Sequence, residues 1–214
     1  MASSQTILSV IGPCSGCGKT LFVTHLLRHI ERLGCLKISP AYDWPEDSGG
    51  GQVVGEDFYL ENSAHLNRPG KDTAVYLAAG ATGVQRLRHR RNGLAAGLAA
   101  ALKCFPPDIP IVVESSSAVR LTEPVAVVLV VRPPHHKMKA TTRDVLHLVT
   151  DLLINALDVE DSAAAEAKRL GTEYPVLQPQ YAFSADLISE PPPDKMLTRL
   201  RALLTRNCAN HQPT

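Results

Sequence analysis

Residues 6–20, TILSVIGPCSGCGKT, decide how this chain folds. The first six are mostly β-branched or apolar and end at a Gly-Pro pair, which predicts a buried strand that runs into a loop. From Lys19 to Leu33, apolar residues recur every three or four positions, which predicts an amphipathic helix with Gly34 as its C-cap. A glycine-rich loop between a strand and a helix is typical of a phosphate-binding loop, the Walker A motif.

The residue types in this loop suit the phosphates of a nucleotide. Glycines let backbone N–H groups approach the phosphates, and the helix N-terminus that follows favours negative charge. Lys19 is placed to reach the terminal phosphates, where we assign it a catalytic role, and the Thr20 hydroxyl is placed to ligate Mg²⁺. We therefore expect the nucleotide to be held by Ser15, Gly16, Cys17, Gly18, Lys19 and Thr20.

Two features of the loop leave alternatives open. The usual first glycine of the motif is replaced by Pro13, with Gly12 one place earlier, so the segment could be a fortuitous glycine-rich turn. Cys14 and Cys17 form a C-x-x-C, which elsewhere indicates redox or metal chemistry. No second cysteine pair completes a zinc site in the sequence, and we favour a phosphate-binding loop without a cysteine function.

Two carboxylates are candidates for the metal and for catalysis. Glu114 ends an apolar run, residues 111–114, and a carboxylate at the C-terminal end of a parallel strand points into the ligand crevice. We predict that Glu114 holds Mg²⁺ or a water on it, in a Walker-B-like role, although it could instead cap the next turn. Asp43 follows a second expected strand, residues 36–39, and is either a switch carboxylate near Mg²⁺ or part of a solvated loop.

Two later segments indicate that the base is guanine. Asn155 and Asp158 follow an apolar strand and are similar to the N-K-x-D motif of GTPases, with Ala156 in place of the lysine. An aspartate there accepts from the N1–H and the exocyclic amine of guanine, a pattern that adenine does not offer. Ser184 and Ala185 resemble the S-A-K motif that backs the same base. A helix-capping role for Asp158 is the alternative.

Strands and helices alternate along the whole chain. The run of Val, Ala and Leu at residues 125–131 is typical of a strand that is covered on both faces, as parallel sheets require. We therefore predict an α/β fold of the P-loop NTPase type, with a doubly wound, mostly parallel sheet flanked by helices. Residues 1–206 would form one domain, with a long loop or hairpin at residues 40–70, and residues 207–214 a C-terminal tail.

Composition excludes several classes of protein. With a formal net charge of +1 and 44% hydrophobic residues, the 214-residue chain is globular and shows no charge excess that favours nucleic acid. Its longest apolar stretch is seven residues, whereas a membrane-spanning helix needs about 20. We expect a cytoplasmic protein.

Four arginines cluster between residues 86 and 91. Three of them alternate along the chain, which is typical of one face of a strand. They could meet an anionic ligand such as a pterin phosphate, but we favour a solvated strand edge. The four are Arg86, Arg88, Arg90 and Arg91.

Together these motifs resemble the molybdopterin-guanine dinucleotide biosynthesis protein B family. Residues 15–20 look like its S-G-x-G-K-T, and Lys37 stands where the family has a lysine at the end of its second strand. Residues 69–73, PGKDT, are similar to its P-G-K-D-S, residues 79–81 to its A-G-A, and Val113-Glu114 to its V-E-G.

The resemblance implies a homodimeric protein that binds GTP and Mg²⁺ and has weak GTPase activity. It also implies a nucleotidyltransferase partner that makes the guanine dinucleotide form of the molybdenum cofactor. The alternative is an ATP-dependent kinase or ligase similar to dethiobiotin synthetase, whose E-G-A-G-G is broken here by three serines, Ser115 to Ser117. A third possibility is a non-catalytic nucleotide-dependent switch.

Overall fold

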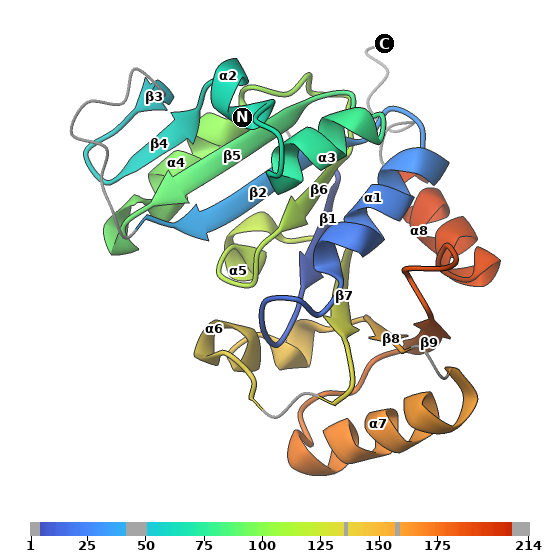
Figure 1. Ribbon diagram of the computed structural model, residues 1–214. Coiled ribbons are helices and arrows are strands. Elements are labelled where there is room, and N and C mark those ends of the chain that lie inside the picture. The colour runs from blue at the N-terminus through green and yellow to red at the C-terminus, as the bar shows by residue number, and fades with distance from the viewer. Residues whose placement is uncertain (1–4, 42–50, 135–136, 157–158, 207–214) are drawn as a thin grey trace.

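The computed structural model describes residues 5–41, 51–134, 137–156 and 159–206. Within them, nine strands join in a single sheet, in the order β3-β4-β5-β2-β6-β1-β7-β8-β9 (Figure 1). The strands are β1 (Ile7–Ile11), β2 (Gly34–Pro40), β3 (Gly51–Val54), β4 (Phe58–Glu61), β5 (Val84–His89), β6 (Ile111–Glu114), β7 (Ala126–Val131), β8 (Asp151–Asn155) and β9 (Tyr181–Ala185).

Seven strands, from β5 to β9 in the sheet order, pair in parallel. At one edge, β3 and β4 form an antiparallel hairpin, and β4 also pairs antiparallel to β5. The chain starts at the centre with β1, moves to β2 on one side, returns to β6 between them, and then continues to β7 on the other side. The C-terminal ends of β1 and β6 therefore lie where the strand order reverses, and in open α/β sheets ligands bind at this point.

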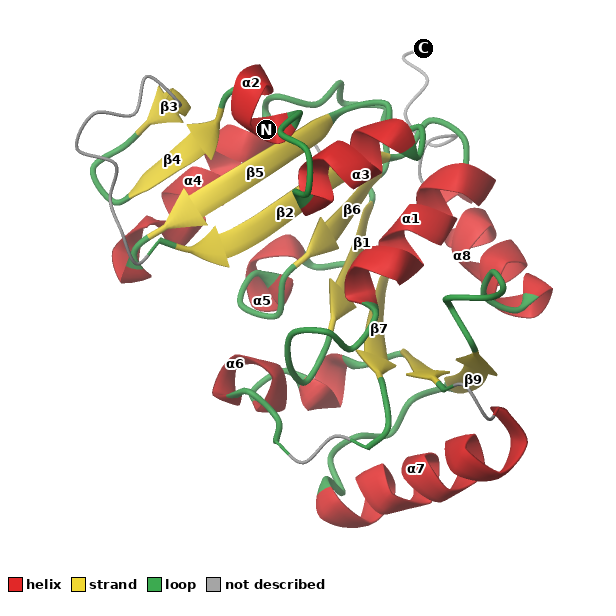
Figure 2. Cartoon of the chain, in the orientation of Figure 1, coloured by secondary structure: helices red, strands yellow, loops and turns green. Residues whose placement is uncertain are grey.

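Helices cover both faces of the sheet (Figure 2). On one face, α1 (Lys19–His29), α3 (Asp72–Ala78) and α8 (Asp194–Arg206) pack on alternate residues of the central strands. On the other face, α4 (Leu94–Leu102) covers one half of the sheet, and α6 (Ala140–Arg143) and α7 (Val159–Glu173) the other, where α5 (Val119–Thr122) also contributes Val119 to the core. A single-turn α2 (Ser63–Leu66) and the 3-10 turns η1 (Arg91–Gly93) and η2 (Leu146–Leu148) complete the chain.

The sequence pattern of each strand matches its place in these layers. All six residues of β7 are buried, because helices cover both of its faces. In β1, Leu8 and Val10 contact the α1 side, whereas Ile7 and Ile11 contact the other side. The predicted α/β fold, a doubly wound and mostly parallel sheet of the P-loop NTPase type, is thus confirmed.

Three local predictions were wrong. The first helix ends at His29, and Gly34 begins β2, because Ile30 is already extended and Arg32 takes the turn with a positive φ of 56°. The sequence of residues 141–149 also predicts a single helix, but the structure has the separate elements α6 and η2 there. The arginine-rich strand β5 is not an edge, since β4 and β2 pair with it on either side.

The long segment at residues 40–70 contains the hairpin that the sequence left open. β3 and β4 form its two strands, and α2 follows them. Residues 42–50, which include Asp43, lie outside the described residues.

Candidate functional site

The loop between β1 and α1 has the backbone that its sequence predicts. Gly18 has a left-handed φ of 101° and a Cβ there would stand 2.3 Å from Asn155 Nδ2, so no other residue fits. Gly12, one place before Pro13, is also closely packed, because a Cβ at this position would lie 2.4 Å from Cys17 Sγ and 3.0 Å from the carbonyl oxygen of Val130. The loop therefore has no room for a side chain at the residue before Pro13.

The Lys19 ammonium lies across the loop. Its Nζ donates to the carbonyl oxygen of Cys14 at 2.7 Å and lies 3.4 Å from Cys17 Sγ. Cys17 is buried and its thiol also contacts the Cys14 carbonyl oxygen at 3.3 Å, while Cys14 is half-buried; both are free thiols. Among the described residues, no group of three or more His, Cys, Asp or Glu side chains could hold a metal ion.

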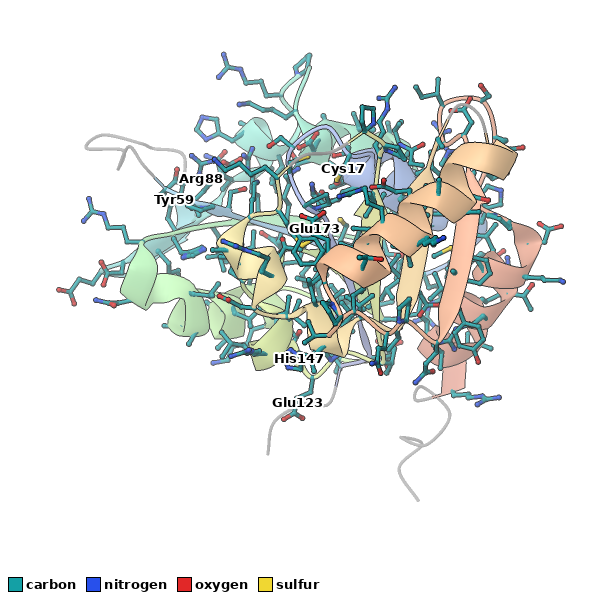
Figure 3. All side chains as sticks on the ribbon, turned by 90° about the horizontal axis from the view of Figure 1, so that it is seen from below. Cys17, Tyr59, Arg88, Glu123, His147 and Glu173 are labelled. Atoms are coloured by element: carbon teal, nitrogen blue, oxygen red, sulfur yellow. The ribbon has the colours of Figure 1, made fainter. Side chains whose placement is uncertain are left out.

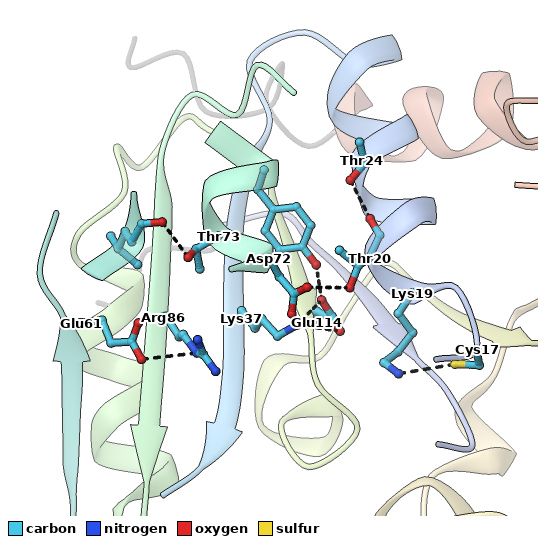
Figure 4. A network of polar contacts seen from close by, with 12 residues as sticks. Cys17, Lys19, Thr20, Thr24, Lys37, Glu61, Asp72, Thr73, Arg86 and Glu114 are labelled. Carbon is cyan, nitrogen blue, oxygen red and sulfur yellow. Dashed lines mark hydrogen bonds and ion pairs between the residues drawn. The ribbon is translucent and has the colours of Figure 1, made fainter. Parts of the chain in front are cut away.

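Beside the loop, a cation and two carboxylates form a polar network that reaches Thr20 through Asp72 (Figure 4). Lys37 at the end of β2 donates to Asp72 Oδ2, and its Nζ lies 3.3 Å from Glu114 Oε2. The Thr20 hydroxyl lies 3.4 Å from Asp72 Oδ1. Strand register explains the arrangement, because Lys37 pairs directly with Glu114 on β6 and both side chains point to the face that α1 and α3 cover.

Tyr76 on α3 completes this network of polar contacts. Its hydroxyl donates to Glu114 Oε2, and the tyrosine is fully buried while Glu114 is only 6% exposed. Burial, and then the neighbouring Glu114 carboxylate, raises the pKa of Tyr76 far above its ordinary value of 10.0. Tyr76 therefore remains a neutral donor, which together with Lys37 satisfies the buried carboxylate.

On the other side of the loop, Asn155 at the end of β8 links two segments. Its Nδ2 donates to the Cys17 carbonyl oxygen at 3.4 Å, and its Oδ1 accepts from Leu187 N at 3.1 Å. Asn155 pairs in register with Ala185, and Ser184 precedes it on β9. The structure thus brings Asn155, Ser184 and Ala185 to one edge next to the phosphate loop, whereas Asp158 lies outside the described residues.

A cavity of about 400 Å³ opens over the phosphate loop. Residues 14–17 form one wall, and the segment after β7 contributes Arg132, Pro133, Pro134 and Lys137 to the other. Arg132 also lowers the pKa of Asp186, after the Ser189 hydroxyl and the Ile188 amide. Two cations beside a phosphate-binding loop suit an anionic ligand.

The sequence analysis left three of these residues without a site role. Lys37 and Asp72 entered only through the family resemblance, and Tyr76 was missed. A signal was present, since Asp72 and Tyr76 are four residues apart on one helix and therefore share a face. What the sequence could not supply is the register that places this face over Glu114.

The oxygens at the site fit Mg²⁺. The Thr20 hydroxyl and the Asp72 carboxylate are hard ligands, and Mg²⁺ is usually held by one or two such groups with the rest from phosphates and water. Asp72 is the accessible carboxylate, since its side chain is 42% exposed and that of Glu114 only 6%. The residues present therefore suit the metal, and Asp72, to which the sequence analysis gave no metal role, lies beside Thr20.

Comparison with known proteins supports the fold. No family model and no curated protein matches this chain. The chain is similar to the crystal structure of hydrogenase maturation factor HypB from Archaeoglobus fulgidus, with a TM-score of 0.54 and 15% identity over 94% of this chain and 91% of that one. In the described part of the chain, no helix is both long and apolar enough to cross a membrane.

Proposed function

We propose that this chain binds GTP with Mg²⁺ and hydrolyses it slowly. The observation that carries the proposal is the convergence of Thr20, Asp72 and Lys37 beside a glycine-rich loop that leads into α1. Phosphoryl transfer requires mainly positioning and electrostatic stabilisation, and this cluster supplies a cation, a hydroxyl and carboxylates within a few ångströms of one another.

The phosphates would lie in the loop that spans residues 14–20. Backbone N–H groups and the N-terminus of α1 favour the negative charge there. Lys19, whose Nζ donates to the Cys14 carbonyl oxygen, would instead donate to the terminal phosphates. Arg132 and Lys137 add positive charge on the opposite wall of the cavity.

Thr20 and Asp72 would hold the metal ion between them and the phosphates. Mg²⁺ bound there would neutralise the charge that develops on the transferred phosphoryl group. Lys37 sets the position of the Asp72 carboxylate, and Glu114 in turn fixes Lys37.

The same contacts favour slow hydrolysis. A general base must be able to accept a proton from the attacking water. The Glu114 carboxylate already accepts from Tyr76 and Lys37, so we assign it a positioning role through Lys37. Fast turnover would then depend on a group that a partner protein supplies.

The preference for guanine rests on the Asn155 side of the loop. Asn155 would keep the phosphate loop and the segment after β9 in register, while Ser184 and Ala185 back the base. Asp158 would accept from guanine N1–H and the exocyclic amine, as its place in the N-K-x-D-like segment suggests.

The process that we propose for this activity is assembly of the molybdenum cofactor. The resemblance to that family is most specific at residues 69–73 together with 79–81, and Asp72 in the first of these segments contacts both Thr20 and Lys37. We therefore propose a homodimer that works with a nucleotidyltransferase making the guanine dinucleotide form of the cofactor.

An ATP-dependent kinase or ligase is the second candidate. It would need a place for an acceptor substrate, and half-buried polar side chains on β5 and its neighbours favour it to that extent. Against it, the serines that break the expected glycine motif are engaged in the fold: Ser116 Oγ lies 2.8 Å from Thr142 Oγ1, which bonds the Gly12 carbonyl oxygen at 2.9 Å.

Calorimetric titration with GTP and with ATP, each in Mg²⁺, tests the proposal. We expect the wild-type chain to prefer GTP, Lys19→Ala to lose binding without unfolding, and Asp158→Ala to lose the preference. Lys103→Ala, an exposed lysine at the end of α4, is the matched control for lost charge. If the chain preferred ATP, the kinase or ligase function would replace the GTPase. If neither nucleotide bound, the phosphate-loop assignment would be wrong.

A further inference from the structure

A second polar row crosses the sheet next to the proposed Mg²⁺ site. Ser39 on β2 pairs with Arg88 on β5, and Arg88 pairs with Tyr59 on β4. Arg88 is two residues beyond Arg86, which pairs with Lys37, so the two rows share one face of the sheet and lie about 7 Å apart. The row lies nearer to the C-terminal ends of β2 and β5, the end at which α/β sheets bind ligands.

The two arginines on this face differ in their partners. Arg86 Nε lies 3.5 Å from Glu61 Oε1, and both side chains are 13% exposed, so this pair is electrically balanced. In the part of the chain that the structure describes, Nε of both arginines is buried without a hydrogen-bond partner, but Arg88, unlike Arg86, also has no carboxylate within ion-pair distance. Most buried donors in folded proteins are paired, because an unpaired one loses its hydration without compensation, so a ligand that accepts from Arg88 would remove this cost.

The surroundings of Arg88 contain hydroxyl groups from both neighbouring strands. Tyr59 and Ser39 are its direct cross-strand partners, and all three side chains are half-buried, so solvent reaches the row. Figure 3 shows Arg88 and Tyr59 on the same side of the molecule as Cys17 of the phosphate loop. A ligand bound at Arg88 would therefore lie on the face where the terminal phosphate is proposed to be.

We propose that Arg88, with the hydroxyls of Ser39 and Tyr59, binds the phosphate or another oxyanion group of a small second substrate. The planar guanidinium presents Nε and an Nη in a fork that matches two oxygens of such a group. Hydroxyls beside the fork can donate to the remaining oxygens. The net charge of +1 gives no field for a polyanion, which favours a small molecule over nucleic acid.

This inference rests on the proposed function: Arg88 would hold a second substrate only if the nucleotide binds at the neighbouring loop. The test is a titration of the full chain, with GDP and Mg²⁺ saturating the loop, followed by nuclear magnetic resonance of the arginine Nε–H groups. Inorganic phosphate and acetate are the two probes, and they separate a phosphate-bearing from a carboxylate-bearing ligand. Arg88→Gln, Arg88→Lys and the exposed control Arg28→Gln are measured in parallel.

We expect phosphate to shift the Arg88 Nε–H resonance saturably, and binding to weaken roughly tenfold to hundredfold in Arg88→Gln. Arg88→Lys should retain only part of the wild-type affinity for phosphate, and Arg28→Gln should bind phosphate as the wild type does. A stronger response to acetate than to phosphate would assign a carboxylate ligand to the same site. If the Arg88 resonance moved with neither probe, or if Arg88→Gln bound phosphate unchanged, the inference would be wrong. Loop amide shifts report GDP separately, so failure of the nucleotide site is distinguishable.

Discussion

Asn155 donates from Nδ2 to the carbonyl oxygen of Cys17, across 3.4 Å, and thereby ties the end of β8 to the phosphate loop. The contact is possible because Gly18, the next residue, has no side chain: its Cα faces the same amide. The position of the loop therefore depends on a residue 138 positions away in the sequence.

The first prediction concerns Gly18→Ala. The new Cβ would stand 2.3 Å from Asn155 Nδ2 and the φ of 101° would be strained, so we expect a loss of about 2–4 kcal/mol in unfolding free energy and of nucleotide binding. Gly16→Ala is the control, since its φ is also positive at 77° but nothing lies within 4 Å of the Cβ. Equal losses in urea unfolding for the two variants would refute the role of Asn155.

Lys37→Met tests the cluster beside the loop. It leaves Glu114, which is 6% exposed, without its cation, and breaking a buried pair costs about 3–5 kcal/mol. Adding Glu114→Gln to Lys37→Met should recover a large part of the lost unfolding free energy, because the neutral amide needs no countercharge when buried. Arg32→Met removes an exposed pair with Asp108, 68% and 59% exposed, and should cost less than about 1 kcal/mol. An additive double variant in urea unfolding would contradict the coupling.

Stability at high pH should depend on Tyr76. Its pKa is raised in the folded chain by burial and by Glu114, so the neutral form is favoured on folding. The contribution is fully present below the ordinary value of 10.0 and is lost as pH rises above it, because only the unfolded state then ionises. The loss is about 1.4 kcal/mol per pH unit from this group.

Tyr76→Phe should remove that part of the slope. Cys35 should also lower stability at high pH, above its ordinary pKa of 9.0, because burial raises the pKa of its thiol in the folded chain. Cys35→Ala removes this contribution and so separates it from that of Tyr76. The measurement is urea unfolding between pH 8 and 11, wild type against each variant. Identical slopes for wild type and Tyr76→Phe would show that Tyr76 ionises equally in both states.

The sequence predicted the parts of the fold that local pattern encodes. The strand, loop and helix of residues 6–29 and the buried run of β7 follow from periodicity and glycine placement alone. Sheet order is not local, so the arginines of β5 appeared to lie on an edge although β4 and β2 flank them. Likewise Glu114 was found as a strand-end carboxylate, but its contacts with Tyr76 and Lys37 depend on register and on the placement of α3.

Arg199→Ala should destabilise the docking of α8. Arg199 donates to both oxygens of Asp151 at 3.0 and 3.2 Å, and Asp151 is completely buried. Without the arginine the carboxylate retains the Thr150 hydroxyl at 2.6 Å but loses its countercharge, for which we expect about 3–5 kcal/mol. Arg201→Ala on the same helix, whose exposed side chain bonds the His29 carbonyl oxygen, should cost much less in thermal unfolding. Equal costs would show that Asp151 does not depend on this charge.

Gly12→Ala tests whether Gly12 replaces the glycine that Pro13 displaced. A Cβ there would lie 2.4 Å from Cys17 Sγ and 3.0 Å from the Val130 carbonyl oxygen, so the loop must shift, at a cost of roughly 1–3 kcal/mol and with weaker nucleotide binding. Cys17→Ala removes the sulfur, and we expect the double variant to regain part of the lost affinity, though not all, because the Val130 contact remains. Pro13→Gly restores the common motif and should leave the affinity for GTP nearly unchanged. It should lower the stability of the fold by at most about 1 kcal/mol, because glycine makes the unfolded chain more flexible. The measurement is calorimetric titration with GTP. If Pro13→Gly bound GTP more tightly while Gly12→Ala bound it normally, position 13 and not position 12 would be the one that requires glycine.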